Sequence, residues 1–166
     1  MTRPMLFLDD GGVMNDPRLR GPQWQRLVAE FFVPRLGGTP EAWSKANRLV
    51  ISRLLEPAAW QARLQAVDDY RSFEYRYQLD WLRMMGALVN VALPEEEACY
   101  HLALEATAAI TRRVQAAFPG ASEAIRLLHR RGYALYTSSG APSTDLANYL
   151  GGWVCTRALS ASMVLT

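Results

Sequence analysis

At 166 residues, with 50% hydrophobic and 20% charged residues, the chain is long enough to bury one core, or a small core with an inserted subdomain, and is not composed like a disordered tail. The formal net charge is +2 and the basic residues are spread along the chain, so we expect no nucleic-acid partner. No apolar stretch approaches the roughly 20 residues needed to span a bilayer, and Met1 to Asp10 lack a signal-peptide core, which predicts a cytoplasmic protein with no membrane partner.

The first predicted element is a short buried strand over Met5 to Leu8. The apolar run is ended by Asp9-Asp10-Gly11-Gly12, a pattern that favours a tight loop directly after the strand. A hairpin is the alternative, because Asp-Gly is a common turn signal. The segment Val13 to Pro17 is too short and polar to pair well, so we expect a carboxylate-bearing loop.

A series of amphipathic helices is predicted to follow this loop. Four of them are expected to start at or near Pro22, Thr39, Pro57 and Pro94, and another is expected to carry Phe73 to Leu88. The last of them is expected to run to about Ala117. Their large aromatic residues are typical of the core of a helical bundle, and a substrate entrance is the alternative use for them. These residues are Trp24, Trp43, Trp60, Phe73, Tyr77 and Trp81.

A further helix and a second strand are expected near the end of the chain. The helix begins at Ser122 and is followed by Gly132, and the strand covers Tyr133 to Tyr136. The order of a strand, many helices and a second strand predicts an α/β fold with parallel strands. Residues 1–16 and 118–166 would form its core, and residues 17–117 would form a helical insertion.

The segment Leu6-Phe7-Leu8-Asp9-Asp10-Gly11-Gly12-Val13 resembles the first motif of the haloacid dehalogenase (HAD) superfamily, an apolar strand followed by Asp-x-Asp-Gly. The resemblance implies an incomplete Rossmann-like core with a helical cap inserted after its first strand. It places Asp9 on the nucleophile, which also ligates magnesium in the family, and Gly12 on the motif glycine. Gly11 stands where the family has a second aspartate, which protonates the leaving group and later activates water.

A second resemblance follows Pro119-Gly120, where an amphipathic helix and Gly132 lead into a strand with the polar end Thr137-Ser138-Ser139. It is similar to the second HAD motif and implies that Thr137 donates its hydroxyl, and Ser138 its backbone N–H, to the phosphoryl group. Ser138 or Ser139 would supply the hydroxyl if the strand were longer. An ordinary loop rich in serine and glycine is the alternative interpretation.

The lysine and the acidic pair of the family's third and fourth motifs are not found. After Ser139 the only acid is Asp145 and the only base is Arg157, while Lys45, the single lysine, lies in the cap region. We therefore expect that the chain is truncated or altered after about residue 150 relative to an intact family member.

The resemblance thus implies a magnesium-dependent hydrolase of the phosphatase type that acts on a small phosphorylated metabolite, with activity impaired by Gly11. Asp9 is the expected nucleophile and metal ligand, and Gly12, Thr137 and Ser138 are the expected phosphate ligands. One alternative is a degenerate relative that binds a phosphate compound or a partner protein, and another is a helical interaction module with an incidental turn. A homodimer would cover the apolar edges of so small a core.

Overall fold

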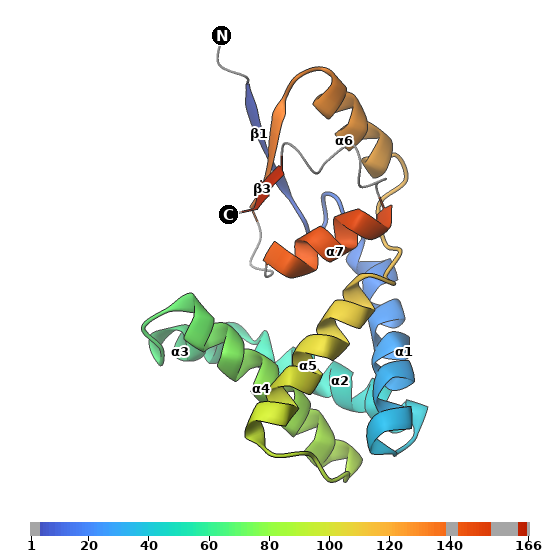
Figure 1. Ribbon diagram of the computed structural model, residues 1–166, viewed down its shortest axis with the longest axis vertical. Coiled ribbons are helices and arrows are strands. Elements are labelled where there is room, and N and C mark those ends of the chain that lie inside the picture. The colour runs from blue at the N-terminus through green and yellow to red at the C-terminus, as the bar shows by residue number, and fades with distance from the viewer. Residues whose placement is uncertain (1–3, 139–142, 154–162, 166) are drawn as a thin grey trace. The chain divides into compact units, whose positions relative to one another are not determined.

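The computed structural model of the protein describes residues 4–138, 143–153 and 163–165. It is mostly helical and contains a small parallel sheet (Figure 1). The chain forms two compact units, one made of Met1–Trp24 with Ile110–Thr166 and the other of Gln25–Ala109. The assignment of residues 17–117 as a cap on a catalytic core remains a prediction. Within the described residues, no helix is both long enough and apolar enough to cross a membrane.

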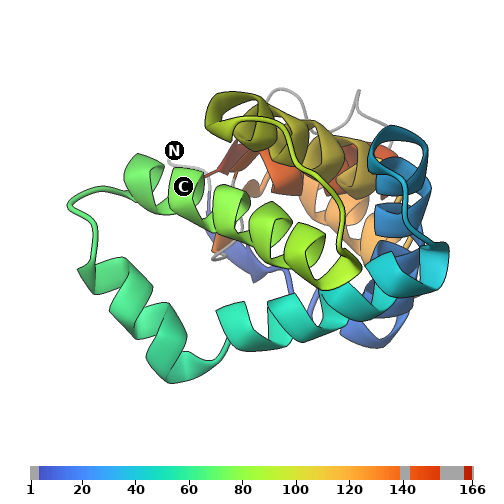
Figure 2. The ribbon, with the colours of Figure 1, turned by 90° about the horizontal axis from the view of Figure 1, so that it is seen from below.

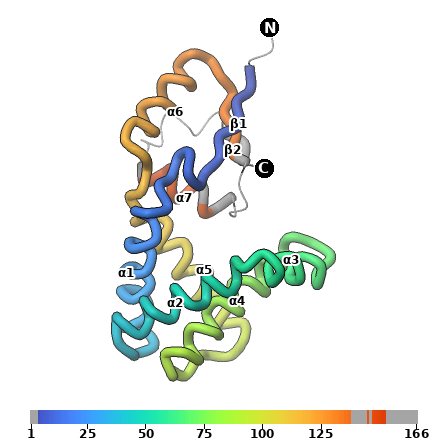
Figure 3. Tube along the Cα trace, turned by 180° about the vertical axis from the view of Figure 1, so that it is seen from behind, coloured from blue at the N-terminus to red at the C-terminus, as the bar shows by residue number. Residues whose placement is uncertain are grey.

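The first unit contains the parallel sheet, whose described strands are ordered β1 (Met5–Asp9), β2 (Ala134–Ser138) and β3 (Met163–Leu165). In the register, Leu8 lies opposite Thr137 and Asp9 lies opposite Ser138. Figure 3 shows β1 and β2 side by side. The predicted parallel pairing of two strands far apart in sequence is therefore confirmed. Neither β3 nor α7 (Ser143–Trp153) was predicted.

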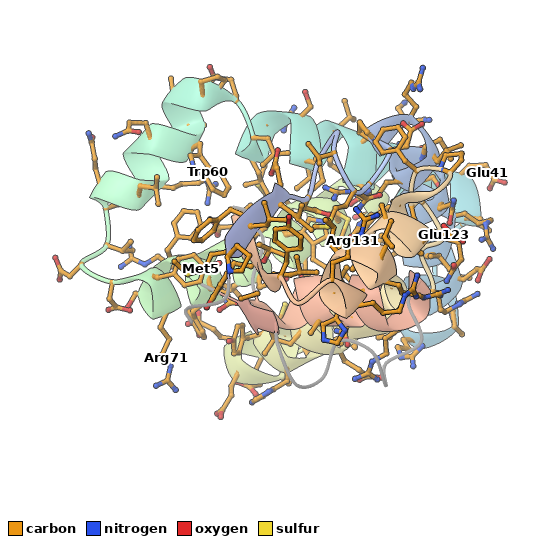
Figure 4. The ribbon with its side chains drawn as sticks, turned by 90° about the horizontal axis from the view of Figure 1, so that it is seen from above. Met5, Glu41, Trp60, Arg71, Glu123 and Arg131 are labelled. Carbon is orange, nitrogen blue, oxygen red and sulfur yellow. The ribbon has the colours of Figure 1, made fainter. Side chains whose placement is uncertain are left out.

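The core of this unit lies against one face of the sheet. Its members come from β1, the following loop, α6 (Ala121–Arg130), the residue before β2, β2 itself and α7, and they are Leu6, Leu8, Met14, Ile125, Leu128, Tyr133, Leu135 and Leu150. On β1 the alternate side chains are exposed, with Met5 at 63% and Phe7 at 62%. Met5 is labelled in Figure 4. Because parallel sheets are normally covered on both faces, the described residues make up only part of an α/β core.

The second unit is built from helices. Between the parts of α1 (Pro17–Leu36) and α5 (Glu96–Thr111) that belong to it, the chain forms α2 (Pro40–Leu54), α3 (Pro57–Gln65) and α4 (Tyr70–Val89). Helix α2 packs along α4 (Figure 2).

Aromatic side chains form the centre of the second unit. Phe32 stacks on Trp43 with ring centroids 4.7 Å apart and contacts the edge of Trp81 at 5.8 Å. All three are buried, and the indole N–H of Trp81 donates to the buried Asn47 amide oxygen at 2.9 Å. Trp43 and Trp81 therefore belong to the bundle core, as their helical spacing indicates.

Two helix boundaries differ from their predicted positions. Helix α1 begins at Pro17 rather than Pro22, because the Asp16 carboxylate caps its first turn by accepting from the Arg18 N–H at 2.9 Å. Helix α5 ends at Thr111, before the predicted Ala117, and the backbone beyond it is used to hold the loop that follows β1.

A close approach between backbone and side chains occurs at Gly38, after α1. Gly38 has a φ of +81°, and a Cβ there would lie 2.6 Å from a methyl carbon of Val89. We expect Gly38→Ala to lower the free energy of unfolding by about 2–4 kcal/mol, because left-handed strain adds to overpacking. Gly37→Ala is the matched control, since Gly37 has a φ of +80° but open space around it, and should lose only about 1–2 kcal/mol. Equal losses in urea unfolding would contradict the close contact.

Candidate active site

The candidate site is the loop that connects β1 to α1, at the carboxyl end of the first strand (Figure 1). Asp9, the last residue of β1, is exposed, and one of its carboxylate oxygens accepts a hydrogen bond from the Asp10 N–H at 2.8 Å. Ligands of parallel α/β sheets bind at this edge. The bond orients a solvent-accessible carboxylate where a ligand would approach.

Backbone hydrogen bonds fix the shape of the loop. The Asp10 carbonyl accepts from the N–H groups of Met14 and Asn15 at 3.1 and 2.9 Å. Gly12 has a φ of +83°, a conformation that favours glycine, and its N–H donates to the Asn15 carbonyl at 2.9 Å. In this structure Gly12 therefore shapes the loop, and its N–H is engaged inside the loop rather than turned toward a ligand.

The segment after α5 holds the far side of the loop. The Asp16 N–H donates to the Ala116 carbonyl at 2.8 Å, and the Phe118 N–H donates to the Met14 carbonyl at 3.0 Å. The backbone that follows the end of α5 at Thr111 is therefore used to hold the loop after β1.

Asp10 faces the protein interior, unlike the exposed Asp9. Its residue is only 3% exposed, and its carboxylate accepts from the Arg20 guanidinium at 2.9 Å and from the Asn15 amide at 3.5 Å. The Arg20 guanidinium lies over the Tyr149 ring, 5.6 Å from its centroid. Tyr149 is buried, and this burial raises the pKa of its hydroxyl. The Asp10 carboxylate is buried whereas the Arg20 side chain is 35% exposed, so loss of Arg20 would leave a buried charge without its ionic partner.

Position 11, to which the sequence resemblance assigns an acid/base, is open in this chain. Gly11 is exposed, and no heavy atom lies within 4 Å of the place where its Cβ would be. Asp10 does not replace the missing group, because its carboxylate is buried against Arg20. The loop thus has an exposed carboxylate at Asp9 and no side chain at position 11, and the role of Asp9 as a nucleophile remains a prediction.

Two of the three predicted phosphate ligands, Thr137 and Ser138, lie on β2, beside β1, and the third, Gly12, lies in the loop after β1. Thr137 is fully buried and pairs with Leu8, whereas Ser138 pairs with Asp9. Because paired residues of a sheet share a face and neighbours alternate, Thr137 lies on the face of Leu8, opposite to that of Asp9. The roles of Thr137 and Ser138 toward phosphate remain predictions, and Ser139 lies outside the described residues.

The predicted magnesium site has only Asp9 as an exposed carboxylate in this loop, since Asp10 and Asp16 are both buried. Across the described residues, no group of three His, Cys, Asp or Glu side chains converges to hold a metal ion. A magnesium site needs about six oxygen ligands, several of them from water or substrate. Asp9 is the one carboxylate that the described part of this loop offers to such an ion, so magnesium remains a prediction and no step below depends on it.

Two residues of this arrangement were not predicted. Arg20 lies in the first turns of α1, and Tyr149 lies on α7. The Asp16-Pro17 pair is a capping signal that would have started α1 earlier and drawn attention to Arg20. The sequence offers no comparable signal for Tyr149.

Two solved structures titled as crystal structure analyses of a dehalogenase, one of them with an intermediate complex, are similar to this chain. The first has a TM-score of 0.51 at 17% identity and is covered over 62% of its length by 99% of this chain. The second has a TM-score of 0.50 at 16% identity and is covered over 64% of its length by 100% of this chain. No family model matches the sequence, and no curated protein matches it either. The likeness shows that the chain shares the fold of these dehalogenases, with only part of the α/β core described, and the chain spans less than two thirds of their length.

Proposed function

We propose that the chain is a HAD-like hydrolase of the phosphatase type, in which the Asp9 carboxylate attacks the phosphorus of a small phosphorylated metabolite. The observation that carries this proposal is the exposed Asp9 carboxylate at the carboxyl end of β1, oriented by the Asp10 N–H at 2.8 Å. Attack forms an Asp9 acyl phosphate and expels an alkoxide, and water then hydrolyses the acyl phosphate. With Gly11 at the acid/base position, both steps are expected to be slow.

A second candidate function is displacement of halide from carbon by the same carboxylate. Gly11 favours it, because a halide leaves as an anion and needs no proton, whereas an alkoxide does. The similar solved structures are titled as dehalogenases. In this reaction Asp9 forms an ester with the substrate carbon, and water cleaves the ester afterwards. A degenerate protein that binds phosphate without turnover is the remaining alternative.

A comparison of Asp9→Asn with Asp68→Asn tests the proposal. Asp68 is an exposed carboxylate in the other unit and serves as the matched control. Each chain is assayed with an aryl phosphate, with magnesium or with a chelator, and with a small haloacid whose halide release is measured. We expect weak phosphate release that Asp9→Asn removes and Asp68→Asn retains.

The other outcomes separate the alternatives. Halide release that depends on Asp9, without phosphate release, would favour the second candidate. Turnover that survives Asp9→Asn would refute the nucleophile assignment. Phosphate binding without any turnover would leave the degenerate alternative.

A further inference from the structure

We propose that Arg20 is a positioning residue for the Asp9 carboxylate and acts on it through Asp10. The inference rests on the proposed function, because positioning matters only if Asp9 is the nucleophile. Arg20 does not contact Asp9 in any hydrogen bond of the described residues. Its effect would pass through the side chain and the backbone of a single intervening residue.

Asp10 links Arg20 to Asp9. Its side chain is held by Arg20 at 2.9 Å, and its N–H donates to the Asp9 carboxylate at 2.8 Å. Its carbonyl accepts from both Met14 and Asn15. Because one residue bears all these bonds, the direction of the Asp10 N–H, and with it the Asp9 carboxylate, depends on how firmly the Asp10 side chain is held.

Arg20 is itself held from more than one side. It lies in the first turns of α1, where its N–H donates to the Asp16 carbonyl at 2.9 Å. Its guanidinium lies over the buried ring of Tyr149, and its side chain is only 35% exposed. A planar guanidinium that lies over an aromatic ring while pairing with a carboxylate is more ordered than a lysine ammonium would be.

Loss of the ion pair between Arg20 and Asp10 is expected to displace the Asp9 carboxylate. An unpaired Asp10 carboxylate is costly to keep buried, so it would move toward solvent. The Asp10 peptide would turn with it, and the Asp9 carboxylate would lose its donor. A displacement of about 1 Å in a reacting group can cost about 10²-fold in rate. The consequence would therefore be local to the loop and larger in kcat than in KM.

The test uses the full chain and the Arg20→Met, Arg20→Lys and Asp9→Asn variants. Arg26→Met is the matched control, because Arg26 is an exposed arginine of the same helix that pairs with Glu30. The first readout is the chemical shift of the Asp10 amide proton as pH is varied through the titration of Asp9. A donor bonded to a carboxylate reports its protonation, and this signal does not require turnover. The second readout is hydrogen exchange of the Met14 and Asn15 amides.

In the wild-type chain and in Arg26→Met, the Asp10 amide should shift with pH, and Asp9→Asn should abolish that shift. Arg20→Met should reduce the shift and speed exchange at Met14 and Asn15 at least about tenfold relative to core amides of the second unit. Relative to Arg20→Met, Arg20→Lys should recover part of the Asp10 shift and part of the slow exchange at Met14 and Asn15, because lysine keeps the charge but not the planar contact. Where turnover is measurable, Arg20→Met should lower kcat more than it raises KM.

An unchanged Asp10 shift in Arg20→Met, with only a global loss of stability, would overturn the proposal. If Arg20→Met does not fold, the double variant Arg20→Met with Asp10→Asn removes the buried charge and keeps the test available. That variant should fold and show a reduced shift, because the guanidinium no longer holds the side chain of residue 10, and retention of the full shift would equally overturn the inference. A normal shift pattern in a chain without Asp9-dependent turnover would refute the proposed function and leave the positioning contact standing.

Discussion

Replacement of Gly11 by aspartate is expected to raise turnover of an alkyl phosphate by about 10²- to 10⁴-fold, the usual contribution of one positioned proton-transfer group. The HAD resemblance assigns the acid/base to this position, and the structure leaves room for it. Gly11 is exposed, its φ lies outside the left-handed region, and nothing lies within 4 Å of its Cβ position. The new carboxyl group would protonate the leaving alkoxide and then activate water against the acyl phosphate. Steady-state phosphate release measures the gain.

Gly11→Asn is the control for this gain. Its side chain has nearly the same size as aspartate but does not transfer protons, so turnover should stay at the level of the parent chain. An equal gain in both variants would mean that a side chain at position 11 acts by stiffening the loop. The absence of any gain in Gly11→Asp would contradict the assignment of this position as the missing acid/base.

The strand pairing was predictable because the two strands and the long crossover between them can each be recognised from the sequence. Met5 to Leu8 and Tyr133 to Tyr136 are short apolar runs with polar residues after them, and a long helical insertion separates them. A parallel pairing needs such a crossover, and the structure pairs Met5–Asp9 with Ala134–Ser138 accordingly. The start of α2 was predictable from the adjacent residues, since Thr39 accepts from the Ala42 N–H at 3.2 Å, as an N-cap does.

The side-chain faces around Asp9 could not be predicted from the same patterns. A shift of one residue in strand register moves every side chain to the opposite face of the sheet. The apolar run before Thr137 does not determine whether Thr137 or Ser138 pairs with Asp9. The structure pairs Ser138 with Asp9 and buries Thr137 on the other face.

The contact between Asp10 and Arg20 was also beyond the sequence patterns. It depends on the turn that the Asp10 carbonyl makes with Met14 and Asn15, and adjacent aspartates give no indication of which one turns inward. Tyr149 belongs to α7, a helix that was not predicted, so its position under Arg20 required the tertiary structure.

With Gly11 present, attack by Asp9 is expected to be much faster than hydrolysis of the acyl phosphate that it forms. Attack of Asp9 on a phosphate ester with a stable leaving group, such as dinitrophenyl phosphate, does not need the missing acid, because dinitrophenolate leaves without a proton. Hydrolysis of the resulting acyl phosphate does need an activated water. Rapid mixing should therefore show a burst of dinitrophenolate approaching one equivalent per chain, followed by steady release slower by about 10²- to 10⁴-fold.

The trapped intermediate would identify both the nucleophile and the reaction. Mass spectrometry of the quenched chain should find the phosphoryl group on the peptide that contains Asp9, and Asp9→Asn should show neither burst nor adduct. Gly11→Asp should shrink the burst, because hydrolysis then keeps pace with attack. If a haloacid leaves an ester on Asp9 while the aryl phosphate leaves nothing, the carboxylate attacks carbon, and the chain is of the dehalogenase type. A linear time course from the first turnover, with no adduct on the Asp9 peptide, would contradict the rate difference attributed to Gly11.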